Sequence, residues 1–319
     1  SFRNCDVVDM TFACIGAVDA MHNTLDWVAR GGEDRNRIGI VVFADNAKYD
    51  LGSSGEYTQG AGGGAILIRH KPRLLAIPDI WGVSTMPVHD FFKPRREVET
   101  RTVVENVLEL AEESGASITS NLAEKILKLL PRSKKKNEVI FENEKIMIHK
   151  DTPVFDGQFS NRCYSESVKQ AFIDFRRKAI DEGRYDPDSD EILTNQWSRI
   201  IVHLPYAFQG KRMFPDVFRH DRRELPMWSK IVEEIGSEPF PSDYADTPEG
   251  IEEFEKANDS YRRLISKTEE FRVFVDERIE KTQRASSLIG NQYTGSIFLA
   301  LMSAMESDYL EDVEIESNR

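Results

Sequence analysis

The chain has 319 residues, and its composition is typical of a soluble globular protein with a sizeable core. Its formal net charge of −13 argues against a nucleic-acid-binding surface, because no broad basic face is available to displace phosphate counterions. Its cysteines, Cys5, Cys14 and Cys163, are scattered and lack CxxC spacing, which argues against a disulfide framework and a zinc site. The apolar runs are too short to cross a bilayer and the first residues lack the regions of a signal peptide, so we expect a cytoplasmic protein without membrane contact.

The first part of the chain predicts a small α/β unit. Residues 5–10 predict a short strand, and apolar residues at helical spacing over 15–28 predict a helix that ends at a glycine pair. Residues 37–45 form a continuous apolar run, which is typical of a strand buried on both faces. Strand, helix and strand in this order predict a right-handed parallel crossover unit. Two further strand-like runs, 65–70 and 73–82, are expected to form a hairpin attached to that sheet.

The rest of the chain is mostly helical in character. Charged helix-forming sequence over 95–150 indicates an inserted helical segment, and 165–183 predicts another amphipathic helix. Residues 198–208 predict a second buried strand that runs into a loop. Charged helices are expected over 228–284, followed by an apolar core helix within 290–305.

Cys14 is the first candidate for chemistry because it lies where a predicted strand turns into a helix. Ala13 and Gly16 leave space for a substrate to approach the sulfur. A thiol in the first helical turn feels the positive end of the helix dipole, which favours the thiolate. Free cysteines are also among the most often buried residues, so a purely structural role is the alternative.

Two further polar residues have a functional and a structural interpretation. His203 ends an apolar strand, where residues of α/β sheets commonly line a ligand crevice, although a lone strand histidine can be structural. Asn291 follows Gly290 before a helix, where its amide could cap the helix, orient a histidine or donate to an oxyanion. The glycine-rich run 60–65 fits neither a P-loop nor a dinucleotide motif, so we expect it to permit close backbone packing. Cys, His and Asn in this chain order indicate acyl transfer by a cysteine nucleophile.

Six blocks of sequence contain these candidates and run in the order TFACIGAVDAMHNTLDWV, VVFADNAKYDLGSSGEYTQGAGGGAILI, VHDFFKP, PVFDGQFSNRCY, VHLPYAFQGKRM and GNQYTGSIFLALMSAM. Together they resemble the hydroxymethylglutaryl-CoA synthases of the thiolase superfamily. The resemblance implies a thiolase-like, duplicated α/β/α/β/α layered fold that is incomplete at both termini and carries a helical insertion. We expect a first half over residues 1–94 with the nucleophile, an insertion over 95–150, and a second half over 151–319 with His203 and Asn291.

The resemblance also implies roles for the three central residues. Cys14 matches the nucleophile that attacks acetyl-CoA and forms an acetyl-enzyme thioester. His203 matches the histidine that binds and polarises acetoacetyl-CoA, and Asn291 matches the asparagine that contacts the acetoacetyl group.

Five further residues match supporting positions of the family. Asp45 and Asp156 correspond to aspartates that support the geometry of the site, and Thr58 corresponds to a substrate-contacting threonine. Lys211 and Arg212 match a basic pair that meets the phosphates of coenzyme A, for which flexible cations are suited.

The implied reaction condenses acetyl-CoA with acetoacetyl-CoA and gives 3-hydroxy-3-methylglutaryl-CoA, an intermediate of the mevalonate route to isoprenoids. The coenzyme A thioesters are substrates, and no metal or separate cofactor is expected. The superfamily implies a homodimer.

Two alternatives stay open. A relative that acts on carrier-protein-bound acyl groups, such as a β-branching or ketoacyl synthase, shares the Cys, His and Asn chemistry. The general-base glutamate of the family would lie before Ser1 and a closing glycine-rich strand after Arg319, so the sequence is expected to be an internal piece of a longer protein. A non-catalytic fragment that keeps the fold is therefore the second alternative.

Overall fold

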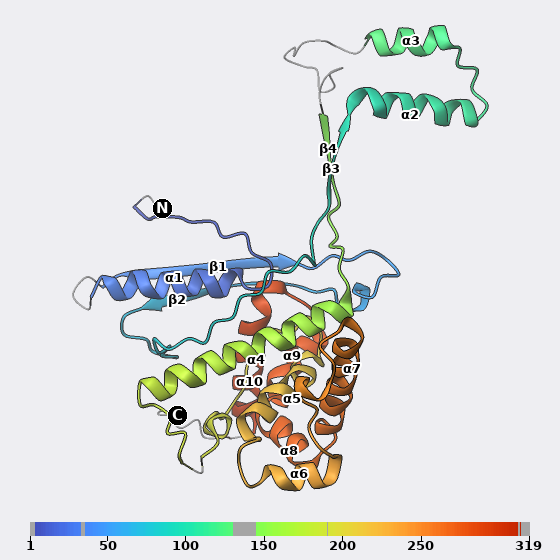
Figure 1. Cartoon of the computed structure of the whole chain (residues 1–319). Helices are drawn as coiled ribbons and strands as arrows, with labels where there is room; N and C mark the ends of the chain where they lie inside the picture. The colour runs from blue at the N-terminus through green and yellow to red at the C-terminus, as the bar shows by residue number, and fades with distance from the viewer. Residues whose placement is uncertain (1–3, 33–35, 130–144, 190, 312, 314–319) are drawn as a thin grey trace. The chain divides into compact units, whose positions relative to one another are not determined.

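A computed structural model of the chain describes residues 4–32, 36–129, 145–189, 191–311 and 313 (Figure 1). Its contacts divide the chain into two units. The first unit combines Ser1–Val88 with Gly157–Arg319, and the second unit is His89–Asp156. Each unit is described by itself.

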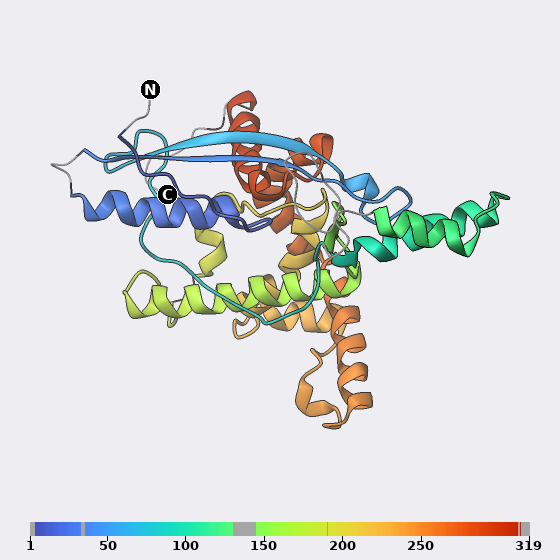
Figure 2. The same cartoon turned by 90° about the horizontal axis from the view of Figure 1, so that it is seen from above.

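The N-terminal part of the first unit is a helix packed on a two-stranded sheet (Figures 1 and 2). Its elements are α1 (Gly16–Arg30), β1 (Ile38–Asn46) and β2 (Ala61–Arg69). The strands pair antiparallel along their whole length, with Val42 opposite Ala65. Side chains alternate across a pleated sheet, so Val41 and Ile68 are buried with Met21 of α1, whereas Val42 is exposed on the other face.

The remainder of the first unit is helical (Figure 1). Its helices are α4 (Gly157–Asp181), α5 (Gln209–Arg222), α6 (Trp228–Ile235), α7 (Pro248–Ile265), α8 (Glu269–Arg278), α9 (Glu280–Ile289) and α10 (Ser296–Leu310). Single 3-10 turns, η2 (Glu56–Thr58), η3 (Leu193–Gln196), η4 (Pro241–Asp243) and η5 (Tyr293–Gly295), lie between the larger elements. The side chains of Thr247 and Thr268 accept backbone N–H groups at the starts of α7 and α8, which satisfies donors that a helix start leaves free.

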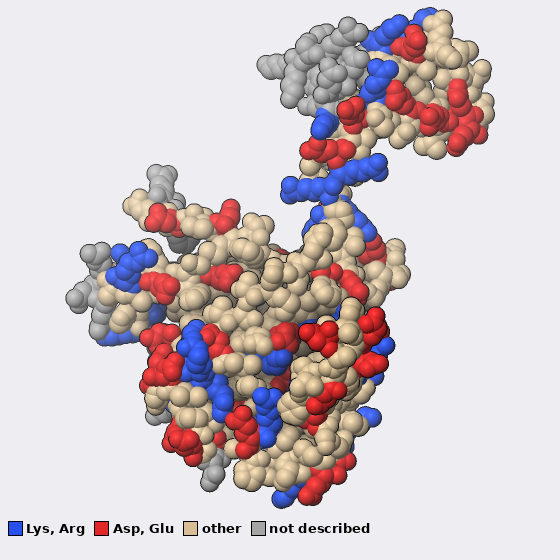
Figure 3. Space-filling model, in the orientation of Figure 1, with Lys and Arg blue, Asp and Glu red and all other residues tan. Residues whose placement is uncertain are grey.

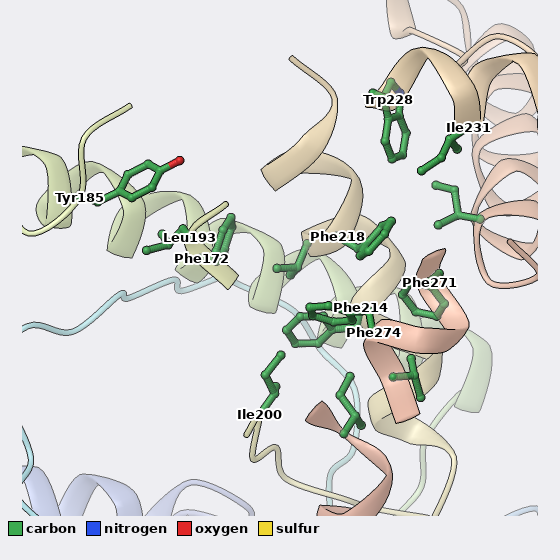
Figure 4. Packing of buried hydrophobic residues seen from close by; sticks show 14 of the residues in the cluster. Phe172, Tyr185, Leu193, Ile200, Phe214, Phe218, Trp228, Ile231, Phe271 and Phe274 are labelled. Carbon is green, nitrogen blue, oxygen red and sulfur yellow. The ribbon is translucent and has the colours of Figure 1, made fainter. Parts of the chain in front are cut away.

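The core of this helical part is built around Phe218 of α5 (Figure 4). Its ring lies 5.2 Å from that of Phe271 and 5.3 Å from that of Phe274, both in edge-to-face geometry, and 6.4 Å from Trp228. The guanidinium of Arg222 lies over the same ring at 4.0 Å. Aromatic pairs in this geometry stabilise a core beyond the area that they bury.

The second unit is an antiparallel strand pair that leads into a helical hairpin. Its elements are β3 (Arg95–Glu99), α2 (Thr100–Glu113), α3 (Ser120–Leu129) and β4 (Lys145–His149). β3 and β4 pair with Glu97 opposite Met147, and an isolated bridge joins Phe92 to Val154. The helices expected between residues 95 and 150 are confirmed by α2 and α3, whereas the two ends of that segment form the strands β3 and β4.

Charges of both signs share the surface of the first unit (Figure 3). Many of them pair, as Arg184 does with Asp79 at 2.9 Å and Arg177 with Asp181 at 3.0 Å. Exposed pairs of this kind add little to stability, so the core carries the fold. Among the described residues, no helix is long and apolar enough to cross a membrane.

The helix predicted over 15–28 is confirmed by α1, but several predicted strands are not formed. Residues 5–10 are irregular with Val7 and Val8 exposed, since the described part of the chain offers them no neighbouring strand. The predicted parallel crossover unit is therefore wrong, because β1 pairs antiparallel with β2 instead. The prediction that 37–45 is buried on both faces is wrong as well, because the burial of β1 alternates.

Two further predicted strands, 73–82 and 198–208, are irregular in the structure. Each segment buries only one or two of its apolar side chains and does not pair with a described strand. Residues 73–82 are irregular: Ile80 is buried in the core, and the Lys178 ammonium donates to the carbonyl of Trp81 at 2.7 Å. Residues 198–208 are also irregular, with Ile200 and Leu204 buried, and the N–H of Ile200 donates to the Arg278 carbonyl at 2.9 Å. Apolar runs of this length indicate burial without fixing a strand.

We expect Phe218→Ala to destabilise the first unit by about 3–5 kcal/mol, because it leaves a cavity among three aromatic rings. Chemical denaturation followed by circular dichroism measures the change. Phe208→Ala is the matched control, since Phe208 is 64% exposed and Phe218 is 1% exposed. Equal losses in the two variants would contradict the assignment of this core.

Candidate active site

A tight backbone contact places Asn291 against residues 58–59, just before β2. The Asn291 N–H donates to the Thr58 carbonyl at 2.8 Å, and Asn291 forms a parallel bridge with Gln59. Gly290 has φ +86°, and a Cβ added there would lie 2.2 Å from the Gln59 oxygen. A Cβ at Gly60 would lie 2.6 Å from the Ile289 carbonyl oxygen. The expectation that the glycine-rich run permits close backbone packing is confirmed.

The turn that follows Asn291 connects to the region of Cys14. The Thr294 hydroxyl accepts the N–H of Ala17 in the first turn of α1, and the Thr294 N–H donates to the Asp45 carboxylate at 3.3 Å. Cys14 lies two residues before α1, and Asp45 lies near the end of β1. The turn therefore contacts both the helix that Cys14 precedes and a carboxylate beside the thiol.

The surroundings of Cys14 favour the neutral thiol. Burial and the negative charge of Asp45 raise the pKa of the Cys14 thiol to about 12. The expectation that the helix start favours the thiolate is therefore wrong for this structure. The physical reasons are that burial desolvates the thiol, that Asp45 adds a negative charge beside it, and that the first-turn N–H of Ala17 is already paired with Thr294.

His203 is held by hydrogen bonds from a different part of the chain. Its Nδ1 is hydrogen-bonded to the Ser296 hydroxyl at the start of α10, and its Nε2 is buried. Burial lowers the pKa of His203 to about 4, while the nearby backbone carbonyl of Tyr293 opposes that shift. The imidazole is consequently neutral at neutral pH and can act as a hydrogen-bond donor or acceptor.

Tyr164 of α4 interacts with both His203 and Cys14. Its hydroxyl donates to the His203 carbonyl at 2.7 Å, and the two rings are 6.1 Å apart. Burial and the neighbouring Cys14 raise the pKa of Tyr164 far above its ordinary value. Tyr164 therefore contacts His203 and also lies near enough to Cys14 to interact with it electrostatically. Sequence reasoning missed this tyrosine, whose only signal is its place in the block PVFDGQFSNRCY.

The side-chain amide of Asn291 is fixed by two hydrogen bonds. Its Oδ1 accepts the Tyr293 N–H at 2.8 Å, and its Nδ2 donates to the Tyr49 hydroxyl at 3.2 Å. Burial raises the pKa of Tyr293, and the hydrogen bond to Tyr49 and the nearby Cys14 and Asp45 raise it further. The amide therefore belongs to the same buried cluster and has a second Nδ2 hydrogen to offer.

Thr58 is buried beside Asn291, but the contact is through its backbone. Its hydroxyl donates to the Gly55 carbonyl at 2.7 Å. Asp156 belongs to the second unit, where its N–H donates to the Asp90 carboxylate at 2.9 Å. The structure thus brings Thr58 to the cluster and describes Asp156 with the other unit.

Lys211 and Arg212 lie in the first turn of α5, a few residues beyond His203. Lys211 forms an ion pair with Glu280, and Arg212 donates to the Tyr206 hydroxyl at 3.1 Å. Arg262 also donates to the Arg212 carbonyl at 3.3 Å, which ties this turn to α7. Within the described ranges, no group of three His, Cys, Asp or Glu residues could hold a metal ion.

The sequence is similar to curated relatives along nearly all of its length. It is 26% identical over 306 residues to the hydroxymethylglutaryl-CoA synthase of Haloferax volcanii, which covers 96% of the chain and 53% of that protein. It is 23% identical over 319 residues to the enzyme of Schizosaccharomyces pombe, which covers 97% of the chain and 55% of that protein. The chain spans about half the length of the curated relatives it matches.

Solved structures show the same fold. The chain matches MvaS in complex with 3-hydroxy-3-methylglutaryl coenzyme A with a TM-score of 0.62 and 22% identity, over 96% of this chain and 53% of that one. It matches PksG, an HMG-CoA synthase from Bacillus subtilis, with a TM-score of 0.51 and 13% identity, over 95% and 48%. The expected thiolase-like fold class is thereby confirmed.

The family described as hydroxymethylglutaryl-coenzyme A synthase C terminal matches residues 140–317, which is more than half of the chain. This match includes His203 and Asn291, and the similarity to the curated relatives extends over the part with Cys14. The chain belongs to the hydroxymethylglutaryl-CoA synthase family.

Proposed function

We propose that this chain provides the acyl-transfer centre of an enzyme that condenses acetyl-CoA with acetoacetyl-CoA. The observation that carries the proposal is the cluster around the turn of residues 290–296. This turn contains Asn291 and contacts both the start of α1 behind Cys14 and the ring of His203. A cysteine, a histidine and an amide from distant parts of the chain suit nucleophilic acyl transfer.

In the proposed first step, the sulfur of Cys14 attacks the thioester carbonyl of acetyl-CoA. The carbon–sulfur bond to coenzyme A breaks, an acetyl-cysteine thioester forms, and the thiol proton of Cys14 ends on the released coenzyme A.

A thioester keeps the methyl protons acidic, so a base can remove one of them and leave a carbon nucleophile; in this family the base is a glutamate, which we place elsewhere in the full-length protein. The carbon adds to the acetoacetyl ketone, whose oxygen takes up a proton. His203 and the Asn291 amide are proposed to polarise the acetoacetyl carbonyl that the carbon attacks. Water then hydrolyses the cysteine thioester, which frees the Cys14 thiol and leaves a carboxylate on the product.

The relatives and the α5 turn support the proposed substrate class. The similar structure of MvaS is a complex with 3-hydroxy-3-methylglutaryl coenzyme A, and another similar HMG-CoA synthase structure is a complex with CoA. Lys211 and Arg212 are the proposed phosphate contacts, with Asp45, Asp156 and Thr58 in supporting roles. We further propose a cytoplasmic homodimer that needs no cofactor beyond its coenzyme A thioester substrates.

We expect the full-length protein that contains this chain to take up label from labelled acetyl-CoA on Cys14. Cys14→Ala should lose essentially all of the covalent label, because Cys14 is the proposed nucleophile and its thiol lies near Asp45 and Tyr164. Mass spectrometry of the labelled peptide identifies the residue. Cys163→Ala is the matched control and should label like the unsubstituted protein. Retention of label in Cys14→Ala would overturn the proposal.

The same preparation separates the substrate classes. Condensation should proceed with acetoacetyl-CoA. Replacing Lys211 and Arg212 by uncharged residues should raise the KM for the CoA substrates more than it lowers kcat. Turnover with acetoacetyl carrier protein but not with acetoacetyl-CoA would instead identify a carrier-protein-dependent synthase. Labelling without any condensation would favour a protein that binds acyl groups without turnover.

We expect alkylation of Cys14 in the ligand-free chain to speed up about tenfold per pH unit from about pH 7 to about pH 10. The reason is that a thiol with a pKa of about 12 gains thiolate steadily over this range. Iodoacetamide labelling followed by peptide mass spectrometry measures the rate. A plateau reached by about pH 8 would mean that the helix start activates the thiol after all.

A further inference from the structure

The hydroxyl of Ser296 is placed to choose which nitrogen of His203 carries the proton. Ser296 is the first residue of α10 and is fully buried. Its Oγ is hydrogen-bonded to Nδ1 of His203 and also accepts the backbone N–H of Leu204 at 3.2 Å. Two adjacent residues of one loop are therefore attached to a single hydroxyl group.

The direction of the hydrogen bond between Ser296 and Nδ1 follows from asking where each available proton can go. A backbone N–H can only donate, so the contact with Leu204 uses a lone pair of the Ser296 oxygen. If Nδ1 also donated, the oxygen would accept twice and its own proton would have no acceptor among the described residues. Buried hydroxyl protons are paired in the great majority of folded proteins. The Ser296 proton therefore points at Nδ1, which accepts it.

The other nitrogen of the ring has the complementary property. His203 Nε2 is buried and forms no hydrogen bond of normal geometry with the described residues, although the backbone carbonyl of Tyr293 lies near the ring. Because the ring is neutral and Nδ1 is an acceptor, Nε2 carries the N–H. A buried donor without a well-aligned protein partner costs free energy, which a ligand oxygen in line with the N–H would recover.

From these contacts we infer that Ser296 is a positioning residue, which holds His203 in the tautomer with its proton on Nε2. The functional consequence rests on the function proposed above. In this tautomer His203 donates a hydrogen bond to a thioester or ketone oxygen as negative charge develops there. The opposite tautomer would present a lone pair to the same oxygen and would repel it.

The test is nitrogen-15 NMR of the ligand-free chain labelled at histidine, near neutral pH. Protonated and unprotonated imidazole nitrogens differ widely in chemical shift, and His203→Gln identifies the His203 signals. We expect Nε2 of His203 to be the protonated nitrogen. Ser296→Ala should lose this predominance and show a mixture or the Nδ1–H form, whereas Ser296→Thr, which keeps the hydroxyl, should retain the Nε2–H form.

Ser303→Ala is the matched control for lost hydrogen bonds in the same helix. The buried Ser303 hydroxyl also accepts a backbone N–H, that of Ala285 at 3.1 Å, and it donates to the Lys281 carbonyl at 2.8 Å. Its removal should leave the His203 spectrum unchanged. An Nδ1–H form in the unsubstituted chain, or an unchanged tautomer in folded Ser296→Ala, would overturn the inference. The spectrum of the unsubstituted chain decides the tautomer even where Ser296→Ala does not fold.

The tautomer is measured without substrate, so its outcome does not depend on the proposed reaction. In the full-length protein we expect Ser296→Ala to lower kcat for condensation while labelling of Cys14 by acetyl-CoA persists. Ser296→Thr should restore kcat. If the tautomer behaves as expected and neither acetylation nor condensation is found in any variant, the positioning role stands and the proposed function falls.

Discussion

The close approach of two backbones, residues 58–62 and 289–292, is the constraint on which the candidate site depends. The parallel bridge between Gln59 and Asn291 holds only because glycines occupy the contact. A side chain at Gly60, Gly62 or Gly290 would overlap backbone or side-chain atoms of the opposite segment. With this contact in place, the turn after Asn291 begins at a defined position, and the hydroxyl and amide groups of that turn reach the elements around it.

Burial decides the chemistry of the groups that the turn brings together. The same desolvation raises the pKa of the Cys14 thiol and lowers the pKa of His203, so both are uncharged at neutral pH. The Asp45 carboxylate adds a negative charge beside Cys14, which opposes the thiolate further. Cys14 and His203 therefore do not form a thiolate–imidazolium pair in the described cluster. Where the reactive groups are neutral, hydrogen bonds that strengthen as charge develops on a bound oxygen are the main source of stabilisation.

The sequence indicated the helices far better than the strands, and the reason is local. The apolar spacing that predicts α1 is satisfied within one segment, because residues three and four apart share a face. The run around Val7 has strand character as well, yet a strand exists only with a neighbour to pair with. The glycine-rich run was interpretable because it lacks every phosphate-binding signature, which left close packing as its role. Tyr164 and Ser296 could not be found in this way, since each matters through a hydrogen bond to His203 in a distant segment.

The turn joins the two parts of the site through alternate residues. Thr294 accepts the first-turn N–H of α1, and Ser296, two residues later, bonds the ring of His203. Because Thr294 and Ser296 are only two residues apart, their two contacts depend on each other. A shift of the turn that lengthens the Thr294 contact also moves the start of α10, where Ser296 lies. Residues 294–296 therefore fix the start of α1, which follows Cys14, and the imidazole of His203 relative to each other. In the tautomer inferred above, a Ser296 hydroxyl proton aimed at Nδ1 extends this positioning from atoms to protons, because it leaves the ring proton of His203 on Nε2.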